Sequence, residues 1–262
     1  MSGMKPVIWL IGGTSEGRGL IKALAGLPVQ LYASVATSYG AALIEPQPNL
    51  TVMAQRMDLN AMRTFLRQHR PDCVIDATHP YATIVTATVQ DACREENAPY
   101  RRLVRPAAEG GQYAYTEVAD FREAVELLNN TEGNIFLTTG SKNLLDFTAV
   151  KNFAERISLR VLPMVSSLQS ALSLGYQPKN IVCMQGPFSS ELDIATFKKY
   201  GAKFIVTKDS GKAGGFEEKA AAAAAVGAKL IVIGRQSKEQ GAGYEELLAE
   251  LRSRYGQKDK GE

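Results

Sequence analysis

Short apolar runs alternate with amphipathic stretches along the first half of the chain. The runs are rich in β-branched residues, and the apolar positions between them recur at the spacing of a helix. Continuous apolar strands separated by helices predict a parallel sheet that is covered on both faces. We expect strands at residues 7–11, 29–35, 51–54, 73–77 and 101–104, with helices that include 61–69 and 84–96.

The same alternation returns after a break at residues 105–111, where a proline and a glycine pair predict a linker. Asp120 followed by Glu123 has the spacing of a capping box, which predicts the start of a helix. The remaining strands are expected at 113–118, 135–139, 157–162, 181–184, 204–207 and 230–233, with helices at 217–226 and 244–255.

This arrangement predicts an α/β fold made of two Rossmann-like, doubly wound parallel-sheet domains. We place the first domain at residues 1–106 and the second at residues 107–262. Residues 7–17 and 135–145 both run from a strand through a turn of small residues into a helix. This internal similarity is weak, and it fits two similar domains that face each other.

The composition is ordinary for a globular protein and narrows the function classes. Apolar residues make up 45% and charged residues 22%, and the net charge of +3 is too small to indicate nucleic-acid binding by itself. No run approaches the roughly 20 apolar residues that span a membrane, and the start lacks the features of a signal peptide. We therefore expect a cytoplasmic protein that binds neither nucleic acid nor membrane.

Cysteine and histidine are too few and too scattered to indicate a metal centre or a disulfide framework. The cysteines are Cys73, Cys93 and Cys183, and the histidines are His69 and His79. An odd number of separated cysteines argues against a disulfide framework, and the absence of a Cys-x-x-Cys pair argues against zinc. No metal site is expected.

The first candidate for ligand binding is the glycine-rich turn after the first strand. Gly12 and Gly17 hold the first and third positions of a Gly-x-Gly-x-x-Gly pattern, and Gly13, Thr14 and Ser15 lie between them. Glycines let the backbone approach a pyrophosphate, and the helix start that follows offers N–H groups. The hydroxyls of Thr14 and Ser15 are expected to donate to phosphate oxygens. The alternative is a structural turn that binds no ligand.

Hydroxyl side chains follow the second strand, where NAD-specific enzymes usually place a carboxylate that binds the ribose. No Asp or Glu lies between Gly17 and Glu45, and Ser34, Thr37 and Ser38 are present instead. These hydroxyls tolerate a 2′-phosphate and favour NADPH over NADH. No Arg or Lys stands beside them to pair with that phosphate, so NADH and a ligand-free polar loop stay open as alternatives.

A second polar segment follows the fourth strand, at the same edge of the predicted sheet as the glycine turn. Ligands in open α/β sheets bind beyond the carboxyl ends of the strands. Thr78 is expected to contact the cofactor there. His79 can donate, accept or shuttle a proton near neutral pH, and Tyr81 offers a hydroxyl and a flat ring. A structural, hydrogen-bonding histidine is the alternative.

Loops of the second half gather basic and hydroxyl residues at predicted strand ends. Residues 207–215 combine two lysines, an acid and two hydroxyls with three glycines, which suits anion binding, but their spacing is not that of a Walker loop. Together with other strand ends they predict a basic, hydroxyl-rich wall, and ordinary solvated loops are the alternative. The residues concerned are Ser141, Lys142, Arg160, Gly186, Lys208, Asp209, Ser210 and Lys212.

Several motifs span nearly the whole chain. They are Ile-Gly-Gly-Thr-Ser-Glu-Gly at 11–17, Ser-Val-Ala-Thr-Ser-Tyr-Gly at 34–40, Asp-Ala-Thr-His-Pro-Tyr-Ala at 76–82, Thr-Gly-Ser-Lys-Asn-Leu at 139–144, Arg-Val-Leu-Pro at 160–163, Gln-Gly-Pro-Phe at 185–188, Thr-Lys-Asp-Ser-Gly at 207–211 and Gly-Gly-Phe-Glu-Glu-Lys at 214–219. In this order they resemble the precorrin-6A (or cobalt-precorrin-6A) reductase family.

The resemblance implies two Rossmann-like domains that can exchange strands, and NADPH as the cofactor, or NADH in the cobalt-containing anaerobic branch. It implies hydride transfer to C19 of a corrin-type macrocycle and a proton added at C18, which converts the 6A intermediate of cobalamin biosynthesis to the 6B product. The tetrapyrrole substrate is expected between the domains, held by loops of the second one. Other enzymes of the pathway are candidate partners.

The implied reaction needs a proton donor and residues that contact the substrate, and the sequence does not choose among the candidates. The proton donor is sought among Lys208, Asp209, Ser210, His79 and Tyr81, and the substrate contacts among Ser141, Lys142, Arg160, Gly186 and Lys212. A short-chain dehydrogenase is a rival, but no tyrosine here has a lysine four residues later. A dinucleotide-sensing module is a second rival, and it would bind the nucleotide without oxidising it.

Overall fold

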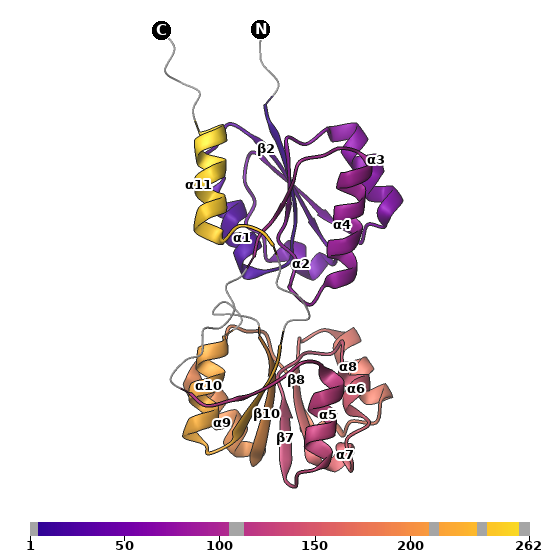
Figure 1. Cartoon of the computed structure of the whole chain (residues 1–262), viewed down its shortest axis with the longest axis vertical. Helices are drawn as coiled ribbons and strands as arrows, with labels where there is room; N and C mark the ends of the chain where they lie inside the picture. The colour runs from indigo at the N-terminus through magenta and orange to yellow at the C-terminus, as the bar shows by residue number, and fades with distance from the viewer. Residues whose placement is uncertain (1–4, 105–112, 210–214, 235–239, 257–262) are drawn as a thin grey trace. The chain divides into compact units, whose positions relative to one another are not determined.

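The computed structural model describes residues 5–104, 113–209, 215–234 and 240–256. The chain divides into two compact units, one formed by residues 1–105 and 239–262 and the other by residues 106–238. Each unit has a parallel sheet with helices on both of its faces (Figure 1). The predicted fold class, an α/β fold of two Rossmann-like parallel-sheet domains, is confirmed.

The first unit contains β1 (Val7–Ile11), α1 (Ser15–Ala23), β2 (Gln30–Val35), α2 (Ser38–Ala42), β3 (Leu50–Ala54), α3 (Leu59–His69), β4 (Cys73–Asp76), α4 (Thr83–Glu95), β5 (Tyr100–Arg102) and α11 (Tyr244–Tyr255). Its strands are parallel and follow the order β3-β2-β1-β4-β5. Helices α1 and α11 cover one face, and α3 and α4 cover the other (Figure 1). Trp9 is fully buried on the second face, against Phe65.

The second unit contains β6 (Thr116–Val118), α5 (Phe121–Asn129), β7 (Asn134–Leu137), α6 (Leu144–Phe147), α7 (Phe153–Arg156), β8 (Ile157–Val161), α8 (Val165–Ser173), the 3-10 helix η1 (Pro178–Asn180), β9 (Ile181–Cys183), α9 (Ser190–Lys199), β10 (Ala202–Lys208), α10 (Phe216–Ala225) and β11 (Lys229–Ile233). The strands are parallel, in the order β6-β11-β10-β7-β8-β9. Small side chains let α10 approach the sheet closely, and Ala220, Ala222 and Ala223 are buried there.

Both sheets share a strand order in which the direction of the chain reverses once. In the first sheet the chain runs from β1 out to β3 and returns to β4 on the other side of β1. In the second it runs from β7 out to β9 and returns to β10 on the other side of β7. The connections after the two central strands therefore leave toward opposite faces. Such a switch point is where ligands bind in open α/β sheets.

Short polar side chains begin several of the helices. Thr14, Thr37, Asp58, Asp120 and Ser189 each accept a hydrogen bond from the backbone N–H group three residues later. Each bond satisfies one of the N–H groups that a helix start leaves without an intrahelical partner. The predicted helix start at Asp120 is among these caps.

The domain boundaries differ from the prediction at the C-terminal end. Residues 239–262 belong to the first unit and not to the second. Helix α11 packs against α1, and Leu247, Leu248, Leu251 and Tyr255 are buried in the core of the first unit. The sequence predicts an apolar face on this helix, but such a face does not identify the sheet it covers. The first unit is therefore built from both ends of the chain.

Leu251→Ala should destabilise the first unit, because Leu251 is only 1% exposed in its core. Removing a buried leucine side chain costs about 2–5 kcal/mol. Trp9 is the single tryptophan and lies in the same unit, so its fluorescence reports the unfolding of that unit in urea. We expect a lower urea midpoint for this variant, and little change for Leu192→Ala, which alters an exposed leucine of the second unit. An unchanged midpoint would show that α11 does not support the first unit.

Candidate functional site

Thr14 ties the turn after β1 to the end of β4. Its hydroxyl donates to the carbonyl oxygen of Ala77 at 2.9 Å and accepts from the N–H group of Gly17 at 3.0 Å. A hydroxyl has one hydrogen to donate, so Thr14 is committed to the fold and is not free to act as the predicted phosphate donor. Its role is to fix the two strand ends that meet at the switch point of the first sheet.

Three glycines shape this turn for different physical reasons. A Cβ atom on Gly12 would come 2.8 Å from Cδ2 of Leu10, and one on Gly17 would come 3.2 Å from Cβ of Ala77. Gly13 has a φ angle of +142°, which L side chains rarely adopt, and the position of its missing Cβ atom faces open space. Gly12 and Gly17 therefore permit close packing, and Gly13 leaves the backbone accessible to a ligand.

The start of α1 lies beside this turn and adds polar and charged side chains to it. Ser15 is exposed and donates to Oε2 of Glu16 at 2.9 Å. Arg18 adds a positive charge beside the turn, where its Nη1 donates to the carbonyl oxygen of Gly13 at 3.4 Å. A helix start also carries the positive end of the helix dipole. Gly13 and the first turn of α1 therefore fit the phosphates of a dinucleotide.

Two of the three hydroxyls predicted at the end of β2 lie at the surface and one lies in the core. Thr37 and Ser38 are exposed, and Thr37 accepts from the N–H group of Gly40 at 3.0 Å. Ser34 is 5% exposed, and its hydroxyl accepts from the indole N–H of Trp9 at 2.8 Å. Ser34 therefore accepts the hydrogen bond that the buried indole of Trp9 needs. Of the three hydroxyls, Thr37 and Ser38 remain as predicted contacts to the cofactor.

A buried ion pair anchors the carboxyl end of β4. Nη1 of Arg102 lies 2.8 Å from Oδ1 of Asp76, and both side chains are buried. The N–H group of Thr78 donates to Asp76 at 3.0 Å, and its hydroxyl accepts from Arg102 at 3.0 Å. Tyr100 donates to Oδ2 of Asp76 at 3.1 Å, and burial and the charge of Asp76 raise the pKa of Tyr100 well above its ordinary value. Thr78 thus belongs to a buried network.

Sequence reasoning missed Arg102, although Asp76 gave a signal for it. A carboxylate placed at the end of a fully buried strand needs a cationic partner, because an unpaired charge in the interior is costly. The search for that partner would have led to β5, which pairs with β4 and places Arg102 opposite Asp76.

His79 and Tyr81 lie together in the connection between β4 and α4. The backbone N–H of Tyr81 donates to Nδ1 of His79 at 3.3 Å, and the two ring centroids are 5.7 Å apart. Both residues are partly exposed. Because β1 and β4 are parallel neighbours, the pair lies at the same edge of the sheet as Gly13, as predicted.

Lys208 lies at the carboxyl end of β10 and is held by side chains of two other segments. Its Nζ donates to Oδ1 of Asn143 at 3.0 Å and lies 5.2 Å from the ring centroid of Phe121. Burial lowers the pKa of Lys208 to about 8, and the charge of Lys142 acts in the same direction, while Asp146 opposes them. The side chain can therefore exchange a proton close to neutral pH.

Other predicted residues lie around the same strand ends. Ser141 donates to Oγ of Ser167 on α8 at 3.4 Å, and Lys142 is exposed. Asp209 follows β10, and its backbone N–H is bonded to the end of β11 at 3.0 Å. Ser210 and Lys212 lie outside the described residues.

Arg160 is buried and does not line the strand-end surface. Its Nη1 lies 2.6 Å from Oδ1 of Asp193, which is also buried. Its guanidinium carbon lies 3.5 Å from the ring centroid of Phe188, and a Cβ atom on Gly186 would come 2.9 Å from the same ring. Arg160 therefore supports the loop after β9, which corrects the prediction that it contacts the substrate. Gly186 keeps its predicted place in that loop.

Large apolar side chains are exposed beside these loops. Leu145, Leu162, Val165 and Met184 are 66%, 45%, 84% and 39% exposed. They follow β7, β8 and β9, which are neighbours in the sheet, so all four lie toward its carboxyl edge. Exposed apolar patches often mark ligand or partner surfaces. Sequence analysis missed them because an apolar residue after a strand resembles a continuation of the core.

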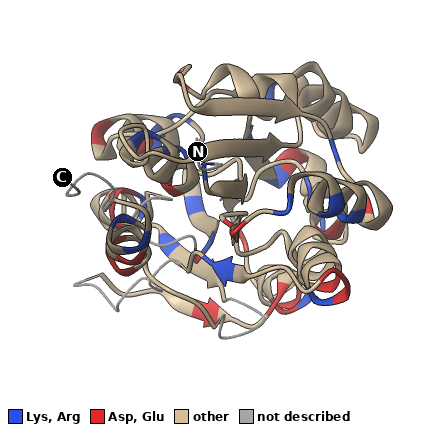
Figure 2. Cartoon of the chain, turned by 90° about the horizontal axis from the view of Figure 1, so that it is seen from above, with Lys and Arg blue, Asp and Glu red and all other residues tan. Residues whose placement is uncertain are grey.

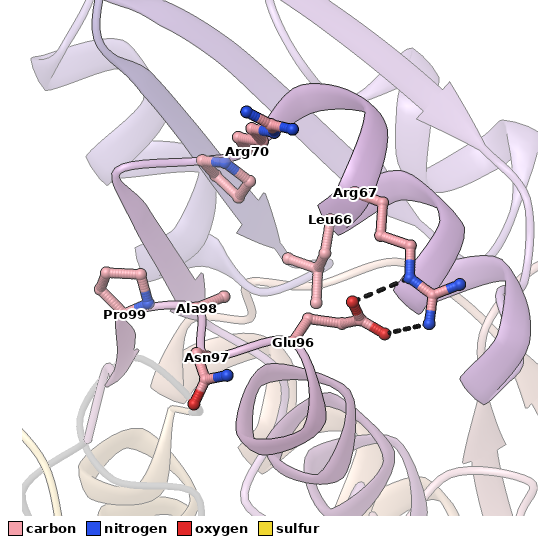
Figure 3. A pocket seen from close by; sticks show the side chains of 8 residues that line it. Leu66, Arg67, Arg70, Glu96, Asn97, Ala98 and Pro99 are labelled. Carbon is pink, nitrogen blue, oxygen red and sulfur yellow. Dashed lines mark hydrogen bonds and ion pairs between the residues drawn. The ribbon is translucent and has the colours of Figure 1, made fainter.

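A surface pocket of about 320 Å³ lies at the opposite edge of the first sheet, where α3 and α4 end. Figure 3 shows the carboxylate of Glu96 turned toward Arg67, with Arg70 directed away from both. Hydrogen bonds from Arg67 and Arg63 lower the pKa of Glu96 to about 2. The charged groups here tie α3 to the end of α4 and do not converge on a ligand, so we do not include this pocket in the candidate site.

Charged residues of both signs occur along the helices, where Lys and Arg positions alternate with Asp and Glu positions (Figure 2). Among the described residues, no helix has the length and apolar character to cross a bilayer, and no three His, Cys, Asp or Glu side chains are grouped to hold a metal ion. The cysteines are free thiols, and burial raises the pKa of Cys73 to about 11 and that of Cys93 to about 12.

Known proteins match most of this chain. Residues 7–252 match the family described as precorrin-6x reductase CbiJ/CobK. The chain belongs to the precorrin-6x reductase family. It is 34% identical over 240 residues to the cobalt-precorrin-6A reductase of Priestia megaterium, which covers 91% of this chain and 94% of the relative. The protein is therefore a reductase, as predicted.

Other relatives of the precorrin-6x reductase family agree. The cobalt-precorrin-6A reductase of Salmonella typhimurium is 33% identical over 237 residues, with 87% of each chain covered. The precorrin-6A reductase of Mycobacterium tuberculosis is 31% identical over 232 residues, with 87% of this chain and 88% of the relative covered. A solved structure named CobK precorrin-6A reductase superposes with a TM-score of 0.76 at 23% identity, covering 95% and 96% of the two chains, which supports the fold.

Gly13→Asp should abolish dinucleotide binding, because a carboxylate at this turn would both block and repel a phosphate. Gly13→Ala is the matched control, since it imposes the same backbone restriction at a positive φ without the charge. We expect fluorescence titration with NADPH to show weak binding for the alanine variant and none for the aspartate variant, with the far-UV spectrum of both preserved. Equal affinity in the aspartate variant and the parent protein would show that the phosphates of the dinucleotide do not bind at this turn.

Proposed function

We propose that the protein reduces precorrin-6A, or its cobalt-containing form, to the corresponding 6B product of cobalamin biosynthesis, with a nicotinamide nucleotide as the hydride source. The observation that carries this proposal is the match of residues 7–252 to the precorrin-6x reductase family, because it includes both units. Relatives of similar length carry this substrate in their names.

The first unit would hold the dinucleotide at the switch point between β1 and β4. The accessible backbone of Gly13, the charge of Arg18 and the start of α1 suit the pyrophosphate. The exposed hydroxyls of Thr37 and Ser38 suit a 2′-phosphate, which favours NADPH. His79 and Tyr81 at the same edge would border the nicotinamide.

The second unit would hold the macrocycle at the carboxyl edge of its sheet. A corrin precursor is a large flat ring with several carboxylates, so it needs an apolar surface with cations beside it. The exposed side chains of Leu145, Leu162 and Val165 offer the apolar surface. Lys142 and Lys208 offer the cations.

Lys208 is the proton donor that we favour among the predicted candidates. The bound nicotinamide supplies a hydride to one carbon of the macrocycle, and a proton must reach the neighbouring carbon to complete the reduction. With a pKa of about 8, Lys208 is mostly protonated at neutral pH and still acidic enough to transfer its proton. Its place at the switch point of the second sheet puts it where a ligand of that unit would lie.

A dinucleotide-sensing module is the second candidate function, since all residues proposed to contact the nucleotide lie in the first unit. The two are distinguished by mixing the protein with purified precorrin-6A, in cobalt-free and cobalt-containing forms, and NADPH or NADH. Loss of nicotinamide absorbance that requires the macrocycle supports the reductase. NADPH binding without oxidation, with either macrocycle present, would favour the sensing module.

Changing Thr37 and Ser38 together to alanine should weaken the binding of NADPH more than the binding of NADH. Losing a hydrogen bond to a charged group costs about 1.5–3 kcal/mol, so the ratio of the two Kd values should change by about tenfold or more. Ser34→Ala is the control, because its hydroxyl binds Trp9 in the core and should not alter that ratio. Equal weakening of both nucleotides would mean that these hydroxyls do not meet a 2′-phosphate.

Lys208→Ala should raise KM for the macrocycle and lower kcat while leaving the Kd of NADPH nearly constant. Loss of a general acid typically lowers the rate by about 10²–10⁴-fold, which separates proton donation from simple binding. Lys203→Ala removes an exposed lysine from the other half of the same strand and should change neither parameter. Unchanged macrocycle kinetics in the Lys208 variant would place the substrate site elsewhere.

A further inference from the structure

Asn143 stands at the start of α6 but does not cap it. Asparagine is among the residues preferred at this position, where its side-chain oxygen usually accepts a backbone N–H of the first turn. Here no such bond forms. The side chain turns instead to two charged residues, with Oδ1 accepting from Nζ of Lys208 at 3.0 Å and Nδ2 donating to Oδ2 of Asp146 at 3.3 Å.

This orientation fixes the amide and the ammonium relative to each other. An ammonium group can only donate hydrogen bonds, so the oxygen of the amide must face Lys208 and its NH₂ must face Asp146. Phe121 lies 5.2 Å from the ammonium on another side, within the range of a cation–π contact. The lysine is therefore guided by side chains that follow β6 and β7, although it belongs to β10.

The pair spans the switch point of the second sheet. Asn143 follows β7, Lys208 ends β10, and these two strands are parallel neighbours. Thr14 bridges the corresponding point of the first sheet, from the turn after β1 to the end of β4. In the second sheet the bridge is made by a side chain that can transfer a proton.

We propose that Asn143 is a positioning residue, which holds the ammonium of Lys208 at the switch point so that it can protonate the macrocycle. The inference rests on the proposed function. In it Asn143 does not contact the substrate and acts by orienting Lys208. A neutral amide is the suitable partner for this task. It accepts a hydrogen bond from the ammonium and orients it, but it carries no full negative charge that would hold the proton.

The charged groups around Lys208 agree with this role. Lys142 lowers its pKa and Asp146 raises it, with burial as the largest cause of a pKa of about 8. Asp209 is the next residue along the chain. A carboxylate at position 143 would be a further acid close to the ammonium, so it should raise the pKa of Lys208 by about 1–3 units.

The test is the dependence of kcat on pH in full-length variants, with precorrin-6A and NADPH as substrates. The parent enzyme should lose activity as pH rises through about 8, because Lys208 must be protonated to act. In Asn143→Asp that alkaline limb should move upward by at least about one pH unit, and kcat at neutral pH should fall because the acid is weaker. Asn152→Asp is the matched control, since Asn152 also begins a four-residue helix without capping it and is exposed.

Asn143→Ser separates positioning from folding. Serine is a good cap for α6, so this variant should keep or raise the melting temperature, but its side chain is too short to reach Lys208 as Asn143 does. We expect kcat to fall by about tenfold or more with the Kd of NADPH unchanged. A serine variant with full activity, or an aspartate variant with the pH profile of the parent, would overturn the inference. If the parent enzyme itself failed to oxidise NADPH with the macrocycle present, the proposed function would fail instead.

Discussion

The polar groups of the candidate site depend on one geometrical constraint of a parallel sheet. Where the strand order reverses, the loops that follow two neighbouring strands lead to opposite faces of the sheet. Each sheet has one such point, between β1 and β4 and between β7 and β10. A side chain links the two neighbouring strand ends at each point. Thr14 does this in the first unit with a hydrogen bond to Ala77, and Asn143 does it in the second with a hydrogen bond from Lys208. The first point has accessible backbone at Gly13 that suits phosphates, and the second has a partly buried ionisable side chain, Lys208.

Two buried ion pairs keep these edges rigid. Asp76 with Arg102 closes the end of β4, and Arg160 with Asp193 links β8 to α9 while Arg160 stacks on Phe188. Burying a charge is costly unless it is paired and hydrogen-bonded, and removing one partner leaves the other uncompensated. The two ion pairs therefore fix the loops that they contact more than they raise the stability of the fold. Of the predicted ligand contacts that lie inside the protein, Thr78 and Arg160 belong to these two networks.

Much of the fold follows from the sequence, because β-branched apolar runs and helical spacing are local properties. The strands at 7–11 and 157–161 and the helix at 244–255 lie almost where the pattern predicts them. The partners of a side chain are not local, and this is where prediction was limited. Ser34 and Thr14 were expected to face a ligand, and both are occupied by long-range hydrogen bonds to Trp9 and Ala77. Glycine turns and strand-end lysines were found because backbone freedom and charge are visible in the residue type itself.

The return of α11 to the first unit affects the order in which the protein can be completed during synthesis. The strands of the first unit are made first, but Leu247 and Leu251, which cover one face of its sheet, are made after all of the second unit. Domains generally fold as units while the chain is extended. Here one apolar face of the first unit stays only partly covered until α11 has been made, whereas all strands and helices of the second unit precede α11 along the chain.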